Sequence, residues 1–140
     1  MTLDLSSLEK AVDSLDRTLK VAADAEFMDR LSDDQKDAVR AGVIQNFEFT
    51  YELCWKFMKR WLKGNLGSAH VEGVARRELF RLAAESKLIG DVNQWMDYHD
   101  ARNETSHAYN QEAAEGVLET AGRFAHDANL FLKALRQKND

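Results

Sequence analysis

The chain has 140 residues, of which 44% are hydrophobic and 31% charged, a formal net charge of −5 and one cysteine. This composition is typical of a globular protein, and the length predicts a single domain over residues 1–140. One cysteine excludes an internal disulfide. The sequence has neither a basic, apolar leader nor a long apolar run, so we expect a cytoplasmic protein with no membrane segment.

The chain contains no proline and seven glycines. Because proline is tolerated in turns and breaks helix interiors, its absence predicts an all-α fold with few loops. The first predicted helix covers Leu5 to Ala23, and Ser6 or Ser7 is its expected cap. Its apolar residues are spaced three and four apart, which is typical of a bundle helix. They are Leu5, Leu8, Val12, Leu15 and Leu19.

A second, longer helix is predicted from Asp34 to Leu62, with Ser32 and two following acids as its start signal. Twelve of the last twenty positions of this helix are apolar. A helix that is apolar nearly all round is central, or faces a second subunit. We interpret Trp55, Trp61 and Trp95 as core or dimer-interface side chains. The segment Lys63–Gly73 is expected to be the one substantial loop.

Two shorter helices are predicted next, Val74 to Ile89, ended by Gly90 in a left-handed conformation, and another starting near Asp91. The last helix is predicted from Gln111 to Arg136. We therefore expect an antiparallel up-and-down bundle of four or five helices. The apolar seam of the last helix is Val117, Ala121, Phe124, Ala128, Phe131 and Leu135.

Basic residues concentrate in the middle of the chain, where residues 35–90 carry ten bases and six acids. A basic patch on an acidic protein can attract RNA or another phosphate-bearing partner. Four of the bases share one helical stripe, and a solvated helix face explains them equally well. The predicted RNA- or phosphate-binding residues are Lys56, Lys59, Arg60 and Lys63. Further bases, Arg76, Arg77 and Arg81, belong to the next helix.

The segment Asp100–Asn110 gathers residues suited to phosphate chemistry. The planar guanidinium of Arg102 suits a phosphate, and His107 can move a proton near neutral pH. Asn103 and Tyr109 lie in the same segment, with no accompanying set of metal ligands, so we expect no metal or cofactor. On a regular helix Arg102 and His107 would point about 140° apart. The helix must therefore end or distort near Ser106, or a second copy of the chain must complete the site.

Structural interpretations of the same residues stay open. Arg102 could pair with Asp97 or Asp100, or with Glu48 or Glu52 on the second helix. His107 could complement a helix dipole at a C-terminus. Tyr109 could be the apolar residue that precedes a cap at Asn110.

The segment RNETSHAY (Arg102–Tyr109) resembles the RX4HXY motif of the HEPN toxins of HEPN/MNT toxin–antitoxin pairs, which are HepT-like proteins. IQNFEFTYELCWKFMKRWL (Ile44–Leu62) and the segment from Glu78 to Asn110 are similar to the related nucleotidyltransferase substrate-binding proteins. The resemblance covers the chain from about Leu3 to Leu135 and implies a dimeric helical bundle with two motifs in a shared cleft.

The resemblance further implies a metal-independent endoribonuclease. Arg102 would hold the scissile phosphate, and His107 would act as general acid or base. Asn103 would help to orient the phosphate or His107. The implied partner is a small MNT-type nucleotidyltransferase that neutralises the toxin, in some pairs by attaching AMP to the motif tyrosine, here Tyr109. The alternative function is a non-catalytic substrate-binding or regulatory subunit of a two-component nucleotidyltransferase.

Overall fold

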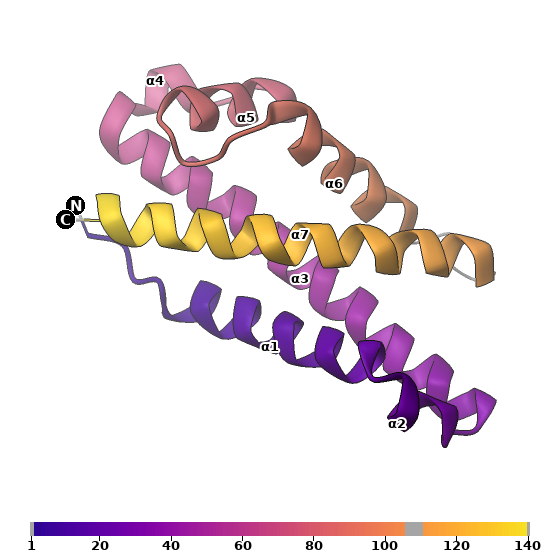
Figure 1. Cartoon of the computed structure of the whole chain (residues 1–140). Coiled ribbons are helices and arrows are strands. Elements are labelled where there is room, and N and C mark those ends of the chain that lie inside the picture. The colour runs from indigo at the N-terminus through magenta and orange to yellow at the C-terminus, as the bar shows by residue number, and fades with distance from the viewer. Residues whose placement is uncertain (1, 106–110, 140) are drawn as a thin grey trace.

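The computed structural model describes residues 2–105 and 111–139, and all regular structure in this part of the chain is helical. The five longer helices and two short ones confirm the prediction of an all-α bundle (Figure 1). They are α1 (Ser6–Ala23), α2 (Ala25–Asp29), α3 (Asp33–Leu66), α4 (Ser68–Val71), α5 (Arg76–Glu85), α6 (Val92–Glu104) and α7 (Gln111–Lys138).

The bundle is built on α3, whose 34 residues span about 50 Å. Helix α1 packs antiparallel to α3 on one side, α7 lies against both, and α5 and α6 lie on the other side of α3 (Figure 1). The chain ends meet at one end of the bundle. There the side-chain amide of Asn139 accepts from the Leu3 N–H at 2.8 Å and donates to the Leu3 carbonyl at 2.9 Å.

The core follows the predicted seams. All six predicted seam residues of α7 are buried, and in α1 the seam is buried except for Leu19, which is partly buried. Trp95 is buried as expected, whereas Trp55 and Trp61 are only partly buried against the core. The ring of Phe124 occupies the centre, with its centroid 5.2 Å from Phe47 and from Tyr98 and 5.7 Å from Trp95.

The starts of two helices test the capping predictions. Ser32 caps α3 as expected, in a capping box that it shares with Gln35. For α1 the prediction of Ser6 or Ser7 was wrong, because Leu5 occupies the cap position and provides no side-chain oxygen. The carboxylate of Asp4 accepts the Ser6 N–H at 3.0 Å instead.

Two predicted boundaries were also wrong. The helix expected to reach Ile89 ends at Glu85, and the left-handed residue is Lys87 (φ 62°), not Gly90. The Lys87 N–H donates to the Ala84 carbonyl, and the next N–H reaches back to Ala83, which is the Schellman pattern. The predicted loop Lys63–Gly73 is largely helical, because α3 continues to Leu66 and α4 follows directly after Gly67 (φ 95°).

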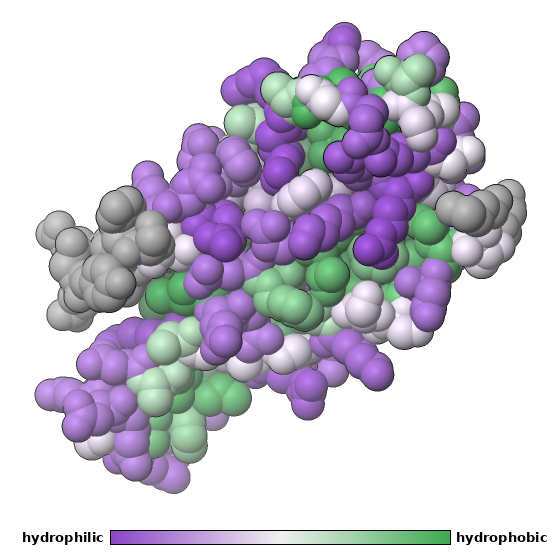
Figure 2. All heavy atoms as spheres, turned by 180° about the vertical axis from the view of Figure 1, so that it is seen from behind, coloured by the Kyte–Doolittle hydropathy of each residue, from purple (hydrophilic) through white to green (hydrophobic). Residues whose placement is uncertain are grey.

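The face seen from behind is predominantly hydrophilic (Figure 2). Seen from behind, apolar side chains gather in a band and at the end of the molecule where α2 lies (Figure 2). None of the helices in the described part of the chain is long and apolar enough to cross a bilayer. The large apolar side chains most exposed to solvent are Val21, Phe27, Phe49, Leu66 and Leu130.

Candidate functional site

The predicted motif lies where α6 ends. Arg102 and Asn103 occupy the last turn of α6, the helix stops at Glu104, and α7 begins at Gln111. The end of α6 at Glu104 lies two residues before Ser106, near which the sequence analysis expects an end or a distortion of the helix. His107 and Tyr109, with the expected cap Asn110, lie outside the described residues.

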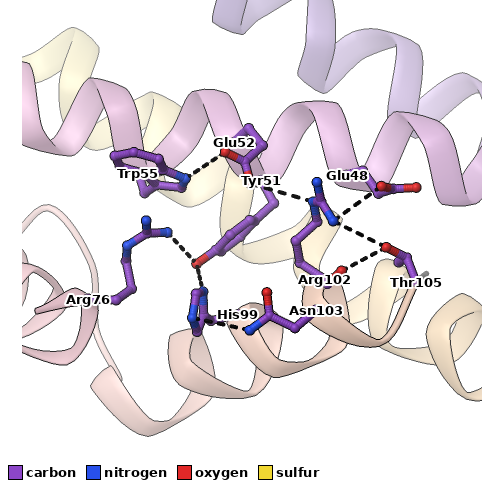
Figure 3. Close-up of polar contacts among 9 residues, drawn as sticks. All are labelled: Glu48, Tyr51, Glu52, Trp55, Arg76, His99, Arg102, Asn103 and Thr105. Atoms are coloured by element: carbon purple, nitrogen blue, oxygen red, sulfur yellow. Dashed lines mark hydrogen bonds and ion pairs between the residues drawn. The ribbon is translucent and has the colours of Figure 1, made fainter. Parts of the chain in front are cut away.

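Arg102 points from α6 onto α3 and contacts two carboxylates there (Figure 3). Its Nη1 lies 3.3 Å from Oε2 of Glu48, and its Nε lies 3.5 Å from Oε1 of Glu52. The Nε atom is buried and has no hydrogen-bond partner among the described residues. The interpretation that Arg102 pairs with Glu48 or Glu52 is thus confirmed for both acids, and the three side chains together carry a net negative charge.

Thr105 fixes the end of the helix around the same arginine. Its hydroxyl donates to the Arg102 carbonyl at 2.7 Å, and Arg102 Nη1 donates back to that hydroxyl at 3.3 Å. Both side chains line an open groove of about 610 Å³ between α6 and the first half of α3. Charged and apolar side chains share this groove, which is lined by Ala41, Ile44, Gln45, Glu48, Phe49, Glu52, Arg102 and Thr105.

A second set of contacts reaches Asn103 from the other side (Figure 3). Asn103 Nδ2 lies 3.4 Å from Nε2 of His99, which is one helical turn earlier. His99 Nδ1 lies 2.8 Å from the hydroxyl of Tyr51 on α3. That hydroxyl also accepts a hydrogen bond from Arg76 Nη1 at 3.1 Å, so one row of contacts joins α5, α3 and α6.

The surroundings of His99 and Tyr51, in the middle of this row, favour the neutral form of each side chain. Burial, and after it the charge of Arg76, lowers the pKa of His99 below its usual value, against weaker opposing effects of Asp100 and Glu52. Burial also raises the pKa of Tyr51 well above its usual value. We therefore expect a neutral imidazole and a protonated phenol at neutral pH, joined by one hydrogen bond.

The predicted basic stripe on α3 divides into two parts. Lys59 and Lys63 both pair with Glu72, with the Lys59 contact at 3.8 Å. Lys56 instead lies 5.8 Å from the ring centre of Trp55, and Arg60 packs over Phe57. Lys63 is eleven positions beyond Glu52, which is about 16 Å along the helix. The far end of the stripe is therefore separated from Arg102.

The sequence analysis did not identify Tyr51 and His99 as members of this region, and it named Arg76 only as a further base on the next helix. The spacing of His99 and Asn103 by four positions in one helix was visible in the sequence. The contact between Tyr51 and Arg76 was not visible in the sequence, because it joins two different helices. Across the described residues, His, Cys, Asp and Glu side chains form no group of three that could hold a metal ion.

Comparisons with known proteins identify the family of the chain. Residues 3–137 match the model of a family described as nucleotidyltransferase substrate binding protein like. A Haemophilus influenzae protein named probable ribonuclease HepT is 36% identical over 138 residues, covering 98% of this chain and 94% of that protein.

Two solved structures are similar. One, from Haemophilus influenzae, is described as the fold of a substrate binding domain of a nucleotidyltransferase. It is 36% identical with a TM-score of 0.93, over 96% of this chain and 100% of that one. The other, from Thermus thermophilus, is 27% identical with a TM-score of 0.73, and the match covers 92% of this chain and 98% of that one. The chain therefore belongs to the nucleotidyltransferase substrate-binding-like family, among HepT-like proteins.

Proposed function

We propose that this chain is the single-domain HEPN subunit of a two-component toxin–antitoxin system, and that it is a metal-independent endoribonuclease. The observation that carries the proposal is the complete RNETSHAY motif in the sequence of a member of this family. The described part of the motif, Arg102 to Thr105, ends α6 beside a groove. The relative named probable ribonuclease HepT supports the same activity.

The roles of the motif residues follow from their chemistry. His107 removes the proton from a ribose 2′-hydroxyl or protonates the leaving 5′-oxygen. The 2′-oxygen attacks the adjacent phosphorus, and the bond from phosphorus to the 5′-oxygen breaks. Arg102 holds the phosphate as negative charge develops on it, and Asn103 orients the phosphate or the imidazole.

The ion pairs of Arg102 add a condition to this mechanism. A guanidinium that contacts Glu48 and Glu52 has part of its charge already compensated. A phosphate must therefore replace at least one of these carboxylate contacts before Arg102 can hold it in the fork geometry that arginine offers.

The proposed assembly is a homodimer that brings two motifs into one cleft. The proposed antitoxin is a nucleotidyltransferase that attaches AMP to Tyr109. A phosphate group two residues from His107 would add negative charge and bulk, which would block access of RNA.

Growth of bacteria that express this chain alone tests the proposal. We expect arrest with the wild type and with His126→Ala, which removes an exposed imidazole on α7, and normal growth with His107→Ala and Arg102→Ala. Purified wild type should cleave RNA with a chelator present, whereas His107→Ala should not. A folded His107→Ala protein that is as toxic as wild type would contradict the proposal.

A second candidate is the non-catalytic binding subunit of a nucleotidyltransferase. The compensation of Arg102 by two acids favours it, because such an arginine is poorly prepared to bind phosphate. Here the wild type alone would neither arrest growth nor cleave RNA. Mixing it with a nucleotidyltransferase encoded beside it would change the activity of that enzyme.

A further inference from the structure

Arg76, the first residue of α5, is held in an unusual environment for an arginine. Its guanidinium carbon lies 3.8 Å from the ring centre of Trp55, and Nη1 donates to the Tyr51 hydroxyl at 3.1 Å. The side chain is partly buried. Stacking on the indole and the hydrogen bond together fix the plane of the guanidinium group.

This fixed cation forms no ion pair within 4 Å with an acid among the described residues. The ion pairs found there include six other arginines and not Arg76. Lys56, on the same indole at 5.8 Å, is absent from them as well. Glu52, which accepts the Trp55 N–H, forms its ion pair with Arg102. Two positive charges therefore surround Trp55.

The position of Arg76 connects it to the motif. Its contact with Tyr51 continues through His99 to Asn103, the neighbour of Arg102, and these residues form one row in Figure 3. A strand of RNA with one phosphate at the motif would carry further phosphates along such a row. Among the described residues this rigid guanidinium donates only to Tyr51, and its planar set of N–H donors is suited to hold one of these phosphates.

We propose that Arg76 is a phosphate-binding residue for single-stranded RNA, fixed by Trp55 and Tyr51 beside the motif. This inference rests on the proposed function, because it assigns a substrate contact near the same site. It places the binding charge on α5, whereas the predicted Lys59 and Lys63 are already paired with Glu72.

Binding of a short fluorescein-labelled single-stranded RNA, followed by fluorescence anisotropy over a series of salt concentrations, tests the inference. All proteins carry His107→Ala, so that cleavage does not interfere. We compare this background with the same protein bearing Arg76→Gln or Arg81→Gln. Arg81 is a matched control, because it lies on the same helix, is exposed and pairs with Glu78 and Glu85.

We expect Arg76→Gln to weaken binding roughly tenfold, as for loss of one charged hydrogen-bonded contact. The slope of log affinity against log salt should become shallower by about 0.7, the value for one phosphate contact to a single strand. Arg81→Gln should change the affinity less than about twofold, because an exposed, paired charge contributes little.

Equal affinities for Arg76→Gln and Arg81→Gln would overturn the inference and leave the proposed nuclease intact. A background protein that binds no RNA would overturn both. A His107→Ala protein that remains toxic would refute the nuclease mechanism alone. If Arg76→Gln fails to fold, as judged by circular dichroism, Arg76→Lys decides. It keeps the charge without the planar fork, so several-fold weaker binding supports the inference and wild-type affinity overturns it.

Discussion

Arg76 lies at one end of a row of contacts, and Arg102 is the chain neighbour of Asn103 at the other end. The surroundings of the two arginines are opposite. Arg102 faces two carboxylates and a threonine hydroxyl. Arg76 faces an indole ring and a phenol. The two guanidinium groups carry the same charge, but only that of Arg102 is compensated by acids among the described residues.

The motif and the distribution of charge thus point to different residues for binding of phosphate. The motif indicates Arg102 as the phosphate ligand, whereas the balance of charge favours Arg76 for the first contact with RNA. Both fit a sequence of events in which RNA binds at Arg76 and a phosphate then displaces a carboxylate from Arg102.

The largest effect on stability is expected from a substitution of Phe124, in the core that supports both arginines. Phe124 is fully buried, and its ring centre lies 6.2 Å from that of Tyr51, which holds Arg76, and 5.2 Å from that of Phe47, the neighbour of Glu48. We expect Phe124→Ala to reduce the free energy of unfolding by about 3–5 kcal/mol, since it leaves a cavity in the core. Urea denaturation followed by circular dichroism measures the change.

Phe27→Ala is the control, because this side chain on α2 is 42% exposed. Its effect on the free energy of unfolding should stay within about 0.5 kcal/mol. Equal losses for the two variants would contradict the position of Phe124 at the centre of the core.

A smaller effect, on RNA affinity, is expected when one of the two carboxylate charges at Arg102 is removed, so that its surroundings become more like those of Arg76. Glu52→Gln removes one of the two carboxylate charges at Arg102 and keeps an oxygen that can accept the Trp55 N–H. We expect RNA to bind the His107→Ala background roughly fivefold more tightly, because a partly exposed ion pair is worth up to about 1 kcal/mol. The same anisotropy assay measures this gain.

Glu85→Gln makes the same change of charge at an exposed position on α5. If both variants bind RNA equally well, the gain comes from net charge and not from release of Arg102, and the contrast between the two arginines loses its functional meaning.

The smallest effect concerns the middle of the row. Because the pKa of folded His99 lies below 6.5, the unfolded chain binds a proton at this residue more readily than the folded protein. This contribution to stability is fully present above the unfolded pKa of 6.5 and is lost as the pH falls from there to the lower folded value. The melting temperature should therefore fall slightly as the pH is lowered through this window.

His99→Gln should flatten this dependence, whereas His126→Gln, at an exposed site on α7, should not. A dependence that is unchanged in His99→Gln would show that other groups cause it.

The fold was largely predictable because apolar spacing is a local property of each helix. The spacing in α1 and α7 predicted which side chains are buried, and the Ser32 signal placed the start of α3 correctly. Gly90 misled the prediction of a helix end. The chain tolerates Lys87 in the left-handed conformation, a choice that tertiary packing permits and residue propensities disfavour.

The site was predictable only in part. The alternative that Arg102 pairs with acids on α3 was visible, since Glu48 and Glu52 are charges on an otherwise apolar helix. The sequence could not show which arginine lacks an ion pair, because the stacking of Arg76 on Trp55 depends on how α5 packs against α3. Contacts between helices of this kind leave no periodic signal in the sequence.

Cys54 is the only cysteine of the chain, it is fully buried in the core, and burial raises the pKa of its thiol. Such a thiol reacts slowly with labelling reagents. A cysteine introduced at an exposed position such as Asp97 on α6 would be the one readily labelled site. The wild-type background therefore suits spin-label spectroscopy, in which a single label per chain would report the distance between the two copies of the proposed homodimer directly.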